Sequence, residues 1–232
     1  MEPLKVDVII PAFNEQESIG KVLADIPVNV VRDVYVCNNA STDNTAEVAA
    51  RVGAIVLDQP IKGYGSACLK AIEHLINKAP EDQPDIIVFL DGDYSDHPEE
   101  MPELINPIVN EDFDLVIGSR VLGNLEKGAM MPQQIFGNWL ATTLIRLLFN
   151  YKFTDLGPFR AVKWESLMEM QMADPNYGWT VEMQVKAARH KMKVREVAVS
   201  YRKRIGVSKV SGTLKGTILA GYKILWTIFK LL

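Results

Sequence analysis

Short apolar runs that alternate with helical patterns limit the fold of this 232-residue sequence more than any other feature. The runs with strand character lie at residues 6–11, 34–37, 54–57, 86–90 and 115–117. Between them, apolar residues recur at helical spacing over residues 15–26, 42–52, 65–78 and 99–109. This alternation predicts an α/β fold, with a doubly wound, mostly parallel sheet and helices on both of its faces.

The second half of the sequence follows a different pattern. Residues 135–149 predict an apolar helix, residues 154–162 a turn that enters a strand, residues 180–189 a helix and residues 194–201 a strand. No linker separates the halves, so we expect one domain over residues 1–210. A basic amphipathic helix over residues 211–232 is expected to follow it.

The composition excludes several protein classes. Apolar residues make up 48% and charged residues 23% of the chain, as in ordinary globular proteins. Disordered, collagen-like and disulfide-knotted chains are therefore excluded, and Cys37 and Cys68 are expected to be small buried residues. The sequence has no signal-peptide pattern and no run of 18 apolar residues, so we expect a cytoplasmic protein.

The charge is distributed unevenly along the chain. Residues 184–232 hold 12 lysines and arginines and one acid, whereas the rest holds 13 basic and 28 acidic residues, and the net charge is −4. A basic tail on an acidic body indicates either an anionic partner or a solvated basic face. A nucleic-acid partner is disfavoured, because the body is acidic and the tail contains no known recognition module.

Polar clusters follow four of the predicted strands, at residues 11–15, 38–43, 91–93 and 118–120. In open α/β sheets, ligands bind beyond the carboxyl ends of the strands, where these clusters would meet. The sharpest cluster is Asp91-Gly92-Asp93, in which two carboxylates flank a glycine after a buried strand. Oxygen ligands of this kind suit Mg²⁺ or Mn²⁺, which also binds substrate phosphates.

Taken in order, these motifs resemble glycosyltransferase family 2. They read Pro-Ala-Phe-Asn-Glu at residues 11–15, Ala-Ser-Thr-Asp-Asn-Thr at 40–45, Asp-Gly-Asp at 91–93 and Gly-Ser-Arg at 118–120. The segments at residues 155–161, 179–183 and 206–209 resemble the dolichyl-phosphate mannose/glucose synthase branch. The resemblance covers about residues 5–212 and implies the GT-A fold, which binds nucleotide sugars, and a hexosyltransferase activity.

The resemblance implies where the nucleotide of the donor binds. Pro11, Phe13 and Glu15 would hold the base and ribose, with Phe13 stacking on the base and Glu15 accepting a hydrogen bond from a ribose hydroxyl. Asn39 stands where the family usually has an aspartate that reads the base edge. Asparagine lacks the charge and pairs less well with the two adjacent donors of guanine, which favours a UDP-sugar over a GDP-sugar.

Lys62 and Gly63 lie in a Lys-Gly-Tyr-Gly segment just before a predicted helix. Glycines and a helix N-terminus allow close approach to a diphosphate, although a simple turn explains the same residues.

The family's pattern also implies the catalytic groups. Asp93 would coordinate the metal and Asp91 would hold metal or sugar, so that charge on the departing diphosphate is neutralised during inverting, in-line transfer. Glu182 lies where the family places an acid near the acceptor. It would be the general base for an alcohol acceptor, or a positioning group for a phosphate acceptor, whose oxyanion is already the nucleophile.

Phosphate groups of donor or acceptor would need cationic or hydroxyl partners, and a guanidinium fork matches phosphate oxygens well. The candidates in this sequence are Ser119, Arg120, Arg160, Arg202, Arg204 and Lys209.

Two helices suggest a membrane surface as partner. Residues 213–232 combine three lysines with leucine, isoleucine, tryptophan and phenylalanine, and residues 135–149 form a second apolar helix. Such helices lie in the membrane interface, or they pack on the body of the protein or on a second subunit. The first possibility fits an enzyme on the inner face of the cell membrane whose acceptor is a polyprenyl phosphate.

Two departures from the branch pattern fall on the acceptor side. Many members of the branch have an arginine shortly before the apolar helix, where this sequence has Pro132-Gln133-Gln134. The usual Pro-Thr-Ser-Gly-Phe-Arg segment is replaced by one that contains Leu156-Gly157-Pro158. A small molecule, a lipid headgroup or a glycan therefore stays open as acceptor. Another alternative is a sugar nucleotidyltransferase, although the glycine-rich signature of such enzymes near the N-terminus is missing. A non-catalytic sensor or scaffold is the last alternative, and retention of Asp91 and Asp93 argues against it.

Overall fold

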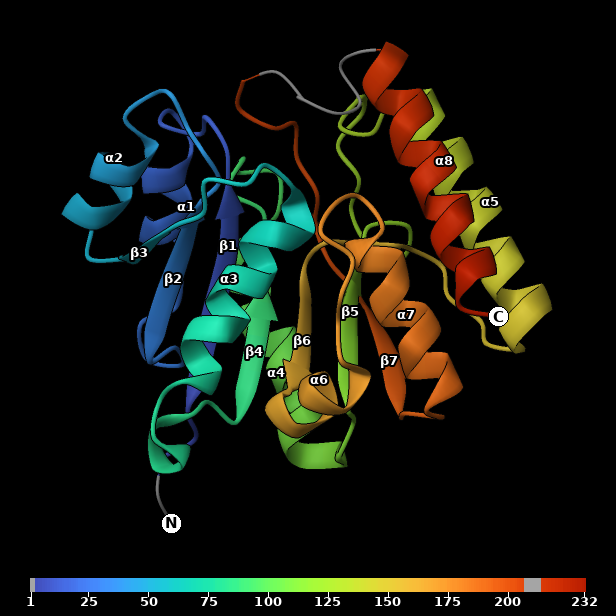
Figure 1. The fold of residues 1–232 in the computed structure, drawn as a ribbon, viewed down its shortest axis with the longest axis horizontal. Helices are drawn as coiled ribbons and strands as arrows, with labels where there is room; N and C mark the ends of the chain where they lie inside the picture. The colour runs from blue at the N-terminus through green and yellow to red at the C-terminus, as the bar shows by residue number, and fades with distance from the viewer. Residues whose placement is uncertain (1–2, 207–213) are drawn as a thin grey trace.

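The computed structural model describes residues 3–206 and 214–232. Within them, seven strands form one sheet in the order β3-β2-β1-β4-β6-β5-β7 (Figure 1). Strand β6 runs antiparallel to β4 and β5, and every other pair is parallel, so the predicted mostly parallel sheet is confirmed. The strands are β1 (Val6–Ala12), β2 (Asp33–Asn38), β3 (Ile55–Asp58), β4 (Ile86–Phe89), β5 (Leu115–Ser119), β6 (Arg160–Lys163) and β7 (Val194–Ala198).

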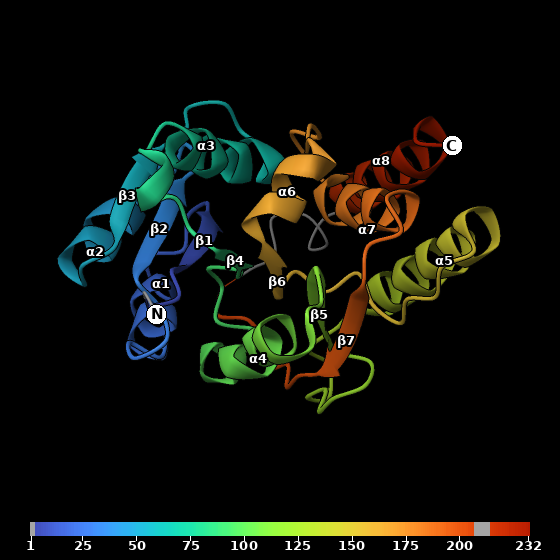
Figure 2. The ribbon, with the colours of Figure 1, turned by 90° about the horizontal axis from the view of Figure 1, so that it is seen from below.

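Helices cover both faces of the sheet, as Figure 2 shows from below. One face carries α1 (Ile19–Ala24), α2 (Thr45–Arg51) and α4 (Met101–Glu111). The other carries α3 (Tyr64–Ile76), α5 (Pro132–Phe149), α6 (Trp164–Met170), α7 (Trp179–Arg189) and α8 (Leu214–Lys230). Because strand residues alternate between faces, Ile87 and Phe89 of β4 enter one core while Ile86 and Val88 enter the other. This explains why β4 is apolar at every position.

Some elements differ from the sequence predictions. Helix α1 begins only at Ile19, because the carbonyl of Glu15 accepts hydrogen bonds from the amides of Ser18 and Ile19 in a turn that precedes the helix. Helix α6 was not predicted, since seven residues are too few to display a helical period. The last strand ends at Ala198 rather than at residue 201, and Tyr201 instead forms isolated bridges with Asp96 and Leu125.

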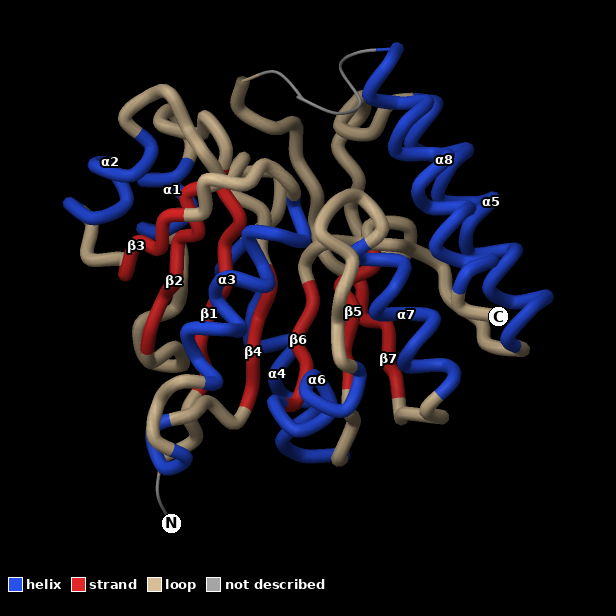
Figure 3. The backbone as a smooth tube through the Cα atoms, in the orientation of Figure 1, coloured by secondary structure: helices blue, strands red, loops and turns tan. Residues whose placement is uncertain are grey.

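The carboxyl ends of β1, β2 and β4 open into loops at one edge of the sheet (Figure 3). Helices α5 and α8 lie side by side at the β7 end of the molecule (Figure 1). Among the described residues, no helix is both long and apolar enough to cross a bilayer.

Candidate functional site

A pocket of about 300 Å³ lies at the carboxyl edge of the sheet, where β1, β2 and β4 end. It brings together residues that are up to 193 positions apart in the sequence, and nine of the predicted site residues line it. The lining residues are Pro11, Ala12, Phe13, Glu15, Asn39, Lys62, Gly63, Tyr64, Asp91, Gly92, Asp93, Tyr177 and Arg204.

The backbone turns sharply after each of the three strands. Asn14, Ala40 and Tyr94 follow β1, β2 and β4 with φ angles of 55°, 57° and 65°, in the left-handed region that residues other than glycine seldom adopt. Strained backbone of this kind is concentrated at functional sites. The turns redirect the chain, so that the side chains beyond each strand end face one pocket.

The Ser-Thr-Asp-Asn-Thr segment at residues 41–45 supports the turn after β1. The amide of Asn14 donates to Ser41 Oγ at 3.0 Å, and the amide of Glu15 donates to Thr45 Oγ1 at 2.8 Å. The amide of Thr42 donates to Asn14 Oδ1 at 2.8 Å. This motif therefore fixes the backbone that presents Phe13 and Glu15 to the pocket.

Asp91 and Asp93 form the acidic side of the pocket. Tyr64 donates its hydroxyl proton to Asp91 Oδ1 at 3.0 Å, and the amide of Ser95 donates to Asp93 Oδ1 at 2.9 Å. Burial, together with the neighbouring charge of Asp93, raises the pKa of Asp91 to about 7. The pair thus concentrates negative charge in a partly dry pocket, an environment that a bound cation would stabilise.

The carboxylate oxygens of Asp91 and Asp93 suit a divalent cation that also binds the phosphate oxygens of a ligand. Within residues 3–206 and 214–232, no group of three His, Cys, Asp or Glu side chains is arranged to hold a metal ion. Mg²⁺ in phosphate-transfer sites is commonly held by one or two carboxylates while phosphate oxygens and water fill the other positions. Asp91 and Asp93 match that arrangement.

Arg204 supplies positive charge directly across the pocket. Its Nη1 lies 3.0 Å from Asp93 Oδ2, and its Nη2 donates to Glu15 Oε1 at 2.7 Å. The Nε of Arg204 is buried and has no hydrogen-bond acceptor in the described structure. A second cation, Lys62 Nζ, lies 4.6 Å from the centre of the Phe13 ring. The pocket therefore offers cations to an anionic ligand next to an aromatic ring.

Asn39 makes contacts that differ from the expected reading of a base edge. Its Oδ1 accepts from the amide of Gly63 at 2.8 Å, and its Nδ2 donates to the carbonyl of Ile61 at 2.8 Å. The side chain thus shapes the loop that carries Lys62 and Gly63, although Asn39 also lines the pocket.

Gly63 and Gly65 lie against the protein's own backbone. A Cβ atom at Gly63 would come within 2.2 Å of the Pro175 carbonyl oxygen, and one at Gly65 within 1.8 Å of the Asp174 carbonyl oxygen. The expected approach to a diphosphate is therefore not needed to explain these glycines. Close packing of the chain on itself requires them.

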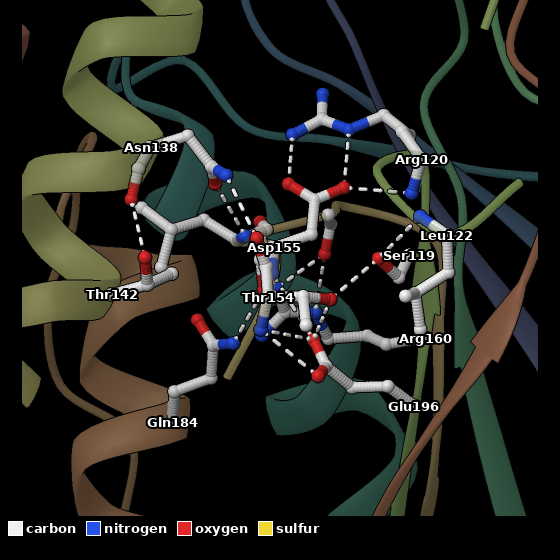
Figure 4. Close-up of polar contacts among 12 residues, drawn as sticks. Ser119, Arg120, Leu122, Asn138, Thr142, Thr154, Asp155, Arg160, Gln184 and Glu196 are labelled. Carbon is white, nitrogen blue, oxygen red and sulfur yellow. Dashed lines mark hydrogen bonds and ion pairs between the residues drawn. The ribbon is translucent and has the colours of Figure 1, made fainter. Parts of the chain in front are cut away.

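Arg120 lies outside the pocket lining, in a buried network drawn in Figure 4. Its Nε and Nη2 donate to the two carboxylate oxygens of Asp155 at 2.8 and 2.7 Å. Burial alone would lower the pKa of Arg120, but the charge and hydrogen bonds of Asp155 outweigh it and raise the pKa. The Ser119 hydroxyl lies 2.7 Å from Thr154 Oγ1 in the same network. Both residues support the loop that begins at Thr154.

The side chain of Arg160 is fully buried. Its guanidinium donates to the backbone carbonyls of Leu156, Gly157 and Thr180. Burial lowers the pKa of Arg160 to about 10. In the described structure these donors are therefore turned to the backbone, and Arg160 does not line the pocket, so its expected phosphate contact stays a prediction.

The remaining cationic candidates lie elsewhere. Arg202 stacks over the Tyr94 ring at 3.4 Å from its centre, and its Nε donates to the Tyr94 carbonyl at 2.7 Å. Arg202 does not line the pocket. Lys209 lies outside the described residues.

Glu182 is buried at the first turn of α7 and does not line the pocket. Its carboxylate accepts from the amides of Ala173 and Asp174, at 3.1 and 2.7 Å, and pairs with Lys186 Nζ at 2.8 Å. In this arrangement Glu182 anchors the loop before α7, and the structure does not bring it to Asp91 and Asp93.

Two tyrosines in the lining were missed as site residues in the sequence. Tyr64 holds Asp91, and Tyr177 lies on the loop between α6 and α7. The position of Tyr64 beside two glycines after β3 was a usable signal. No local signal marks Tyr177, because its loop reaches the pocket only through long-range packing.

Known proteins are similar to this chain in sequence and in fold. The family model described as "Glycosyl transferase family 2" matches residues 7–170. An uncharacterised glycosyltransferase of Mycobacterium tuberculosis is 37% identical over 218 residues, which cover 93% of this chain and 94% of that relative. A dolichyl-phosphate hexose transferase of Haloferax volcanii is 30% identical over 205 residues, covering 88% of this chain and 85% of the relative.

Among solved structures, glucosyl-3-phosphoglycerate synthase from Mycobacterium tuberculosis has the same fold. Its complex with Mn²⁺, UDP and phosphoglyceric acid matches with a TM-score of 0.76 at 21% identity, over 98% of this chain and 78% of that chain. The family match covers more than half of the sequence and includes the Asp91–Asp93 motif. The chain therefore belongs to glycosyl transferase family 2 and is a glycosyltransferase.

Proposed function

We propose that this glycosyltransferase moves a sugar from a nucleotide-diphosphate sugar to a polyprenyl phosphate, with Mg²⁺ or Mn²⁺ bound by Asp91 and Asp93. The single observation that carries the proposal is the pocket in which this carboxylate pair faces Phe13, Glu15 and Arg204. A nucleotide needs a ring to stack on, a polar partner for its ribose and a cationic environment for its diphosphate. The pocket offers these three features together.

Each of these pocket residues has its own role in binding the donor or in transfer. Phe13 stacks on the base, and Glu15 accepts from the ribose. Arg204, whose buried Nε has no acceptor of its own, donates to the diphosphate. A divalent cation bound by Asp91 and Asp93 supplies charge neutralisation for the leaving diphosphate. Transfer with inversion then follows from in-line attack of the acceptor oxyanion on the anomeric carbon.

We favour UDP over GDP as the carrier. Support comes from the fold relative, glucosyl-3-phosphoglycerate synthase, which was solved with Mn²⁺ and UDP-glucose. Asn39 adds nothing to this choice, because its Oδ1 and Nδ2 are both bonded to the loop at residues 61–63, and it shapes the pocket through that loop.

The polyprenyl phosphate acceptor is supported by the dolichyl-phosphate hexose transferase relative. It is also supported by an exposed apolar surface on the two neighbouring helices α5 and α8, which we call the α5–α8 face. This face carries Ile135, Phe136, Trp139, Leu147, Ile218, Leu219, Tyr222, Trp226 and Phe229. Apolar and aromatic side chains of this kind bind the headgroup region of a bilayer, and lysines attract anionic lipids. We propose that α8, whose inner side buries Ile228 in the core, presents this face to the membrane.

A soluble phosphate is the second candidate acceptor. The fold relative was solved with phosphoglyceric acid, a small phosphorylated acid. The two acceptors share a phosphate group and differ in the lipid chain.

The test is a transfer assay with radiolabelled UDP-glucose and other UDP- and GDP-sugars in the presence of Mn²⁺. One arm contains a short polyprenyl phosphate in detergent, and the other contains 3-phosphoglycerate. Label that moves into the organic phase supports the polyprenyl phosphate acceptor. Label that moves only into a charged water-soluble product assigns the soluble acceptor instead. No transfer from any sugar nucleotide to either acceptor would contradict the proposal.

A further inference from the structure

Residues 173–178 lie in the loop that joins α6 to α7 and reaches the pocket. Tyr177 lines the pocket from this loop. The carbonyl of Pro175 accepts hydrogen bonds from the amide of Ser66 at 2.8 Å and from its hydroxyl at 3.1 Å. The loop is therefore joined to the start of α3, the segment that carries Lys62, Gly63 and Tyr64.

The contact between the two segments is very close. Gly63 and Gly65 leave no room for a Cβ atom beside the carbonyl oxygens of Pro175 and Asp174. Interiors that are packed this tightly transmit a displacement rather than absorb it. A shift of the 173–178 loop would thus move the pocket residues at the start of α3.

Asp174 ties this loop to helix α8. Its Oδ2 lies 2.9 Å from Lys223 Nζ and accepts from Thr227 Oγ1 at 3.3 Å, while its Oδ1 accepts from the amide of Asn176 at 2.8 Å. The Asp174 side chain is 7% exposed, so its ion pair is only partly screened by solvent. A Cβ atom at Gly178 would come within 2.4 Å of both Asp174 Oδ2 and Thr227 Oγ1, so this junction too is closely packed.

A second anchor holds the same loop from the other side. Glu182 of α7 accepts from the amides of Ala173 and Asp174, as described above. That anchor lies within nine residues of the loop, whereas Lys223 and Thr227 reach it from the far end of the chain. The contacts of Asp174 with Lys223 and Thr227 therefore couple the loop to the position of α8.

We propose that Asp174 is a positioning residue for donor binding, through which α8 holds Tyr177 and the start of α3 in the binding-competent arrangement. This inference rests on the proposed function, because it needs the pocket to bind the donor nucleotide. Asp174 itself does not line the pocket and acts only through the loop. Loss of the contact between Asp174 and α8 weakens donor binding and does not change the rate of the chemical step at Asp91 and Asp93.

The test compares Lys223→Gln and Thr227→Val, on the α8 side, with Asp174→Asn on the loop side. Asp174→Asn keeps an oxygen for the Asn176 amide and removes the charge that faces Lys223. Lys230→Gln is the matched control, since Lys230 is an exposed lysine of the same helix. Dissociation constants of UDP with Mn²⁺ are measured by calorimetry, KM and kcat by transfer assay, and folding by the melting temperature.

We expect Asp174→Asn and Lys223→Gln each to weaken UDP binding and raise the donor KM by about tenfold, a change of about 1.4 kcal/mol. The kcat should stay within about twofold of wild type, and Lys230→Gln should bind UDP like wild type. The double variant Asp174→Asn/Lys223→Gln should bind no more weakly than the weaker single variant, because both changes break one contact.

Unchanged UDP affinity in folded Asp174→Asn and Lys223→Gln would overturn the inference while leaving the proposed function in place. Fully additive losses in the double variant would also overturn it, since the two residues would then act separately. A loss of kcat at unchanged KM would assign a different role to Asp174. If wild-type protein bound no nucleotide, the proposed function would fail, and the inference would fall with it.

Discussion

Arg204 Nη1 lies 3.0 Å from Asp93 Oδ2, on the carboxylate that we propose as a metal ligand. A guanidinium and a divalent cation both bind carboxylate oxygens, so Arg204 and a metal would compete for Asp93. Glu15, whose Oε1 accepts from Arg204 Nη2 at 2.7 Å, would remain as the second partner of this guanidinium. We therefore expect the contact between Asp93 and Arg204 to change when metal and donor bind.

Arg204→Gln should separate the effect of Arg204 on metal binding at Asp93 from its effect on diphosphate binding. The variant should bind Mn²⁺ alone at least as well as wild type, because the competing cation is gone. It should bind UDP with Mn²⁺ about 10–100-fold more weakly, since a hydrogen bond to a charged group contributes about 1.5–3 kcal/mol. Calorimetry with UDP, and with uridine, which lacks the diphosphate, measures how much of the lost affinity depends on the diphosphate. Equal losses for UDP and uridine would show that Arg204 does not contact the diphosphate.

Tyr64→Phe removes the hydroxyl that donates to Asp91 Oδ1. Without this hydrogen bond the Asp91 carboxylate is less well positioned, so the Mn²⁺ concentration needed for half-maximal transfer should rise by about tenfold. The melting temperature should change little, because the ring remains. A titration of transfer rate against Mn²⁺ checks this. An unchanged Mn²⁺ requirement would exclude Tyr64 as a support of the metal site.

Arg120→Ala should mainly destabilise the protein. It leaves the carboxylate of Asp155 buried without its ion-pair partner, which costs about 3–5 kcal/mol of the free energy of unfolding. The double variant Arg120→Met/Asp155→Leu should recover part of that loss, because no buried charge is left alone. Urea denaturation measures the free energy of unfolding of both variants. Normal stability in Arg120→Ala combined with a raised acceptor KM would instead restore the phosphate-binding role expected from the sequence.

Replacing Trp226 and Phe229 by alanine should weaken attachment to membranes. Both side chains are about half exposed on α8, at 52% and 53%. Burying a large apolar side chain contributes about 1.5–3 kcal/mol, so the double variant should bind vesicles of phosphatidylglycerol and phosphatidylcholine at least tenfold more weakly. Val109→Ala, on the exposed side of α4, is the control. If the double variant binds vesicles normally but loses a dimer in solution, the α5–α8 face is a subunit interface.

Most residues that line the pocket could be predicted from the sequence. Phe13 and Asn39 follow apolar strands directly, Asp91 and Asp93 lie just beyond a third strand, and the carboxyl ends of parallel strands meet at one edge. Local sequence therefore carried most of that prediction. The order of the strands, by contrast, depends on packing over the whole chain.

The acceptor side could not be predicted in the same way. Arg160 looks like a phosphate ligand in the sequence, but β6 lies between β4 and β5 and buries the side chain completely. Arg120 is paired with Asp155, 35 residues further on, and Gly65 packs against Asp174, more than 100 residues away. Such contacts arise only when the chain is folded, and no local pattern reveals them.

The metal site is tested most sharply by the binding of UDP to wild-type protein and to Asp93→Asn, measured by calorimetry with and without Mn²⁺. Asp112→Asn, which alters a carboxylate that is 71% exposed, is the control. We predict that wild type and Asp112→Asn bind UDP much more tightly with Mn²⁺, and that Asp93→Asn loses this gain. Equal binding of UDP by Asp93→Asn and wild type in the presence of Mn²⁺ would contradict the proposal that the Asp91–Asp93 pocket holds a metal-bound sugar nucleotide.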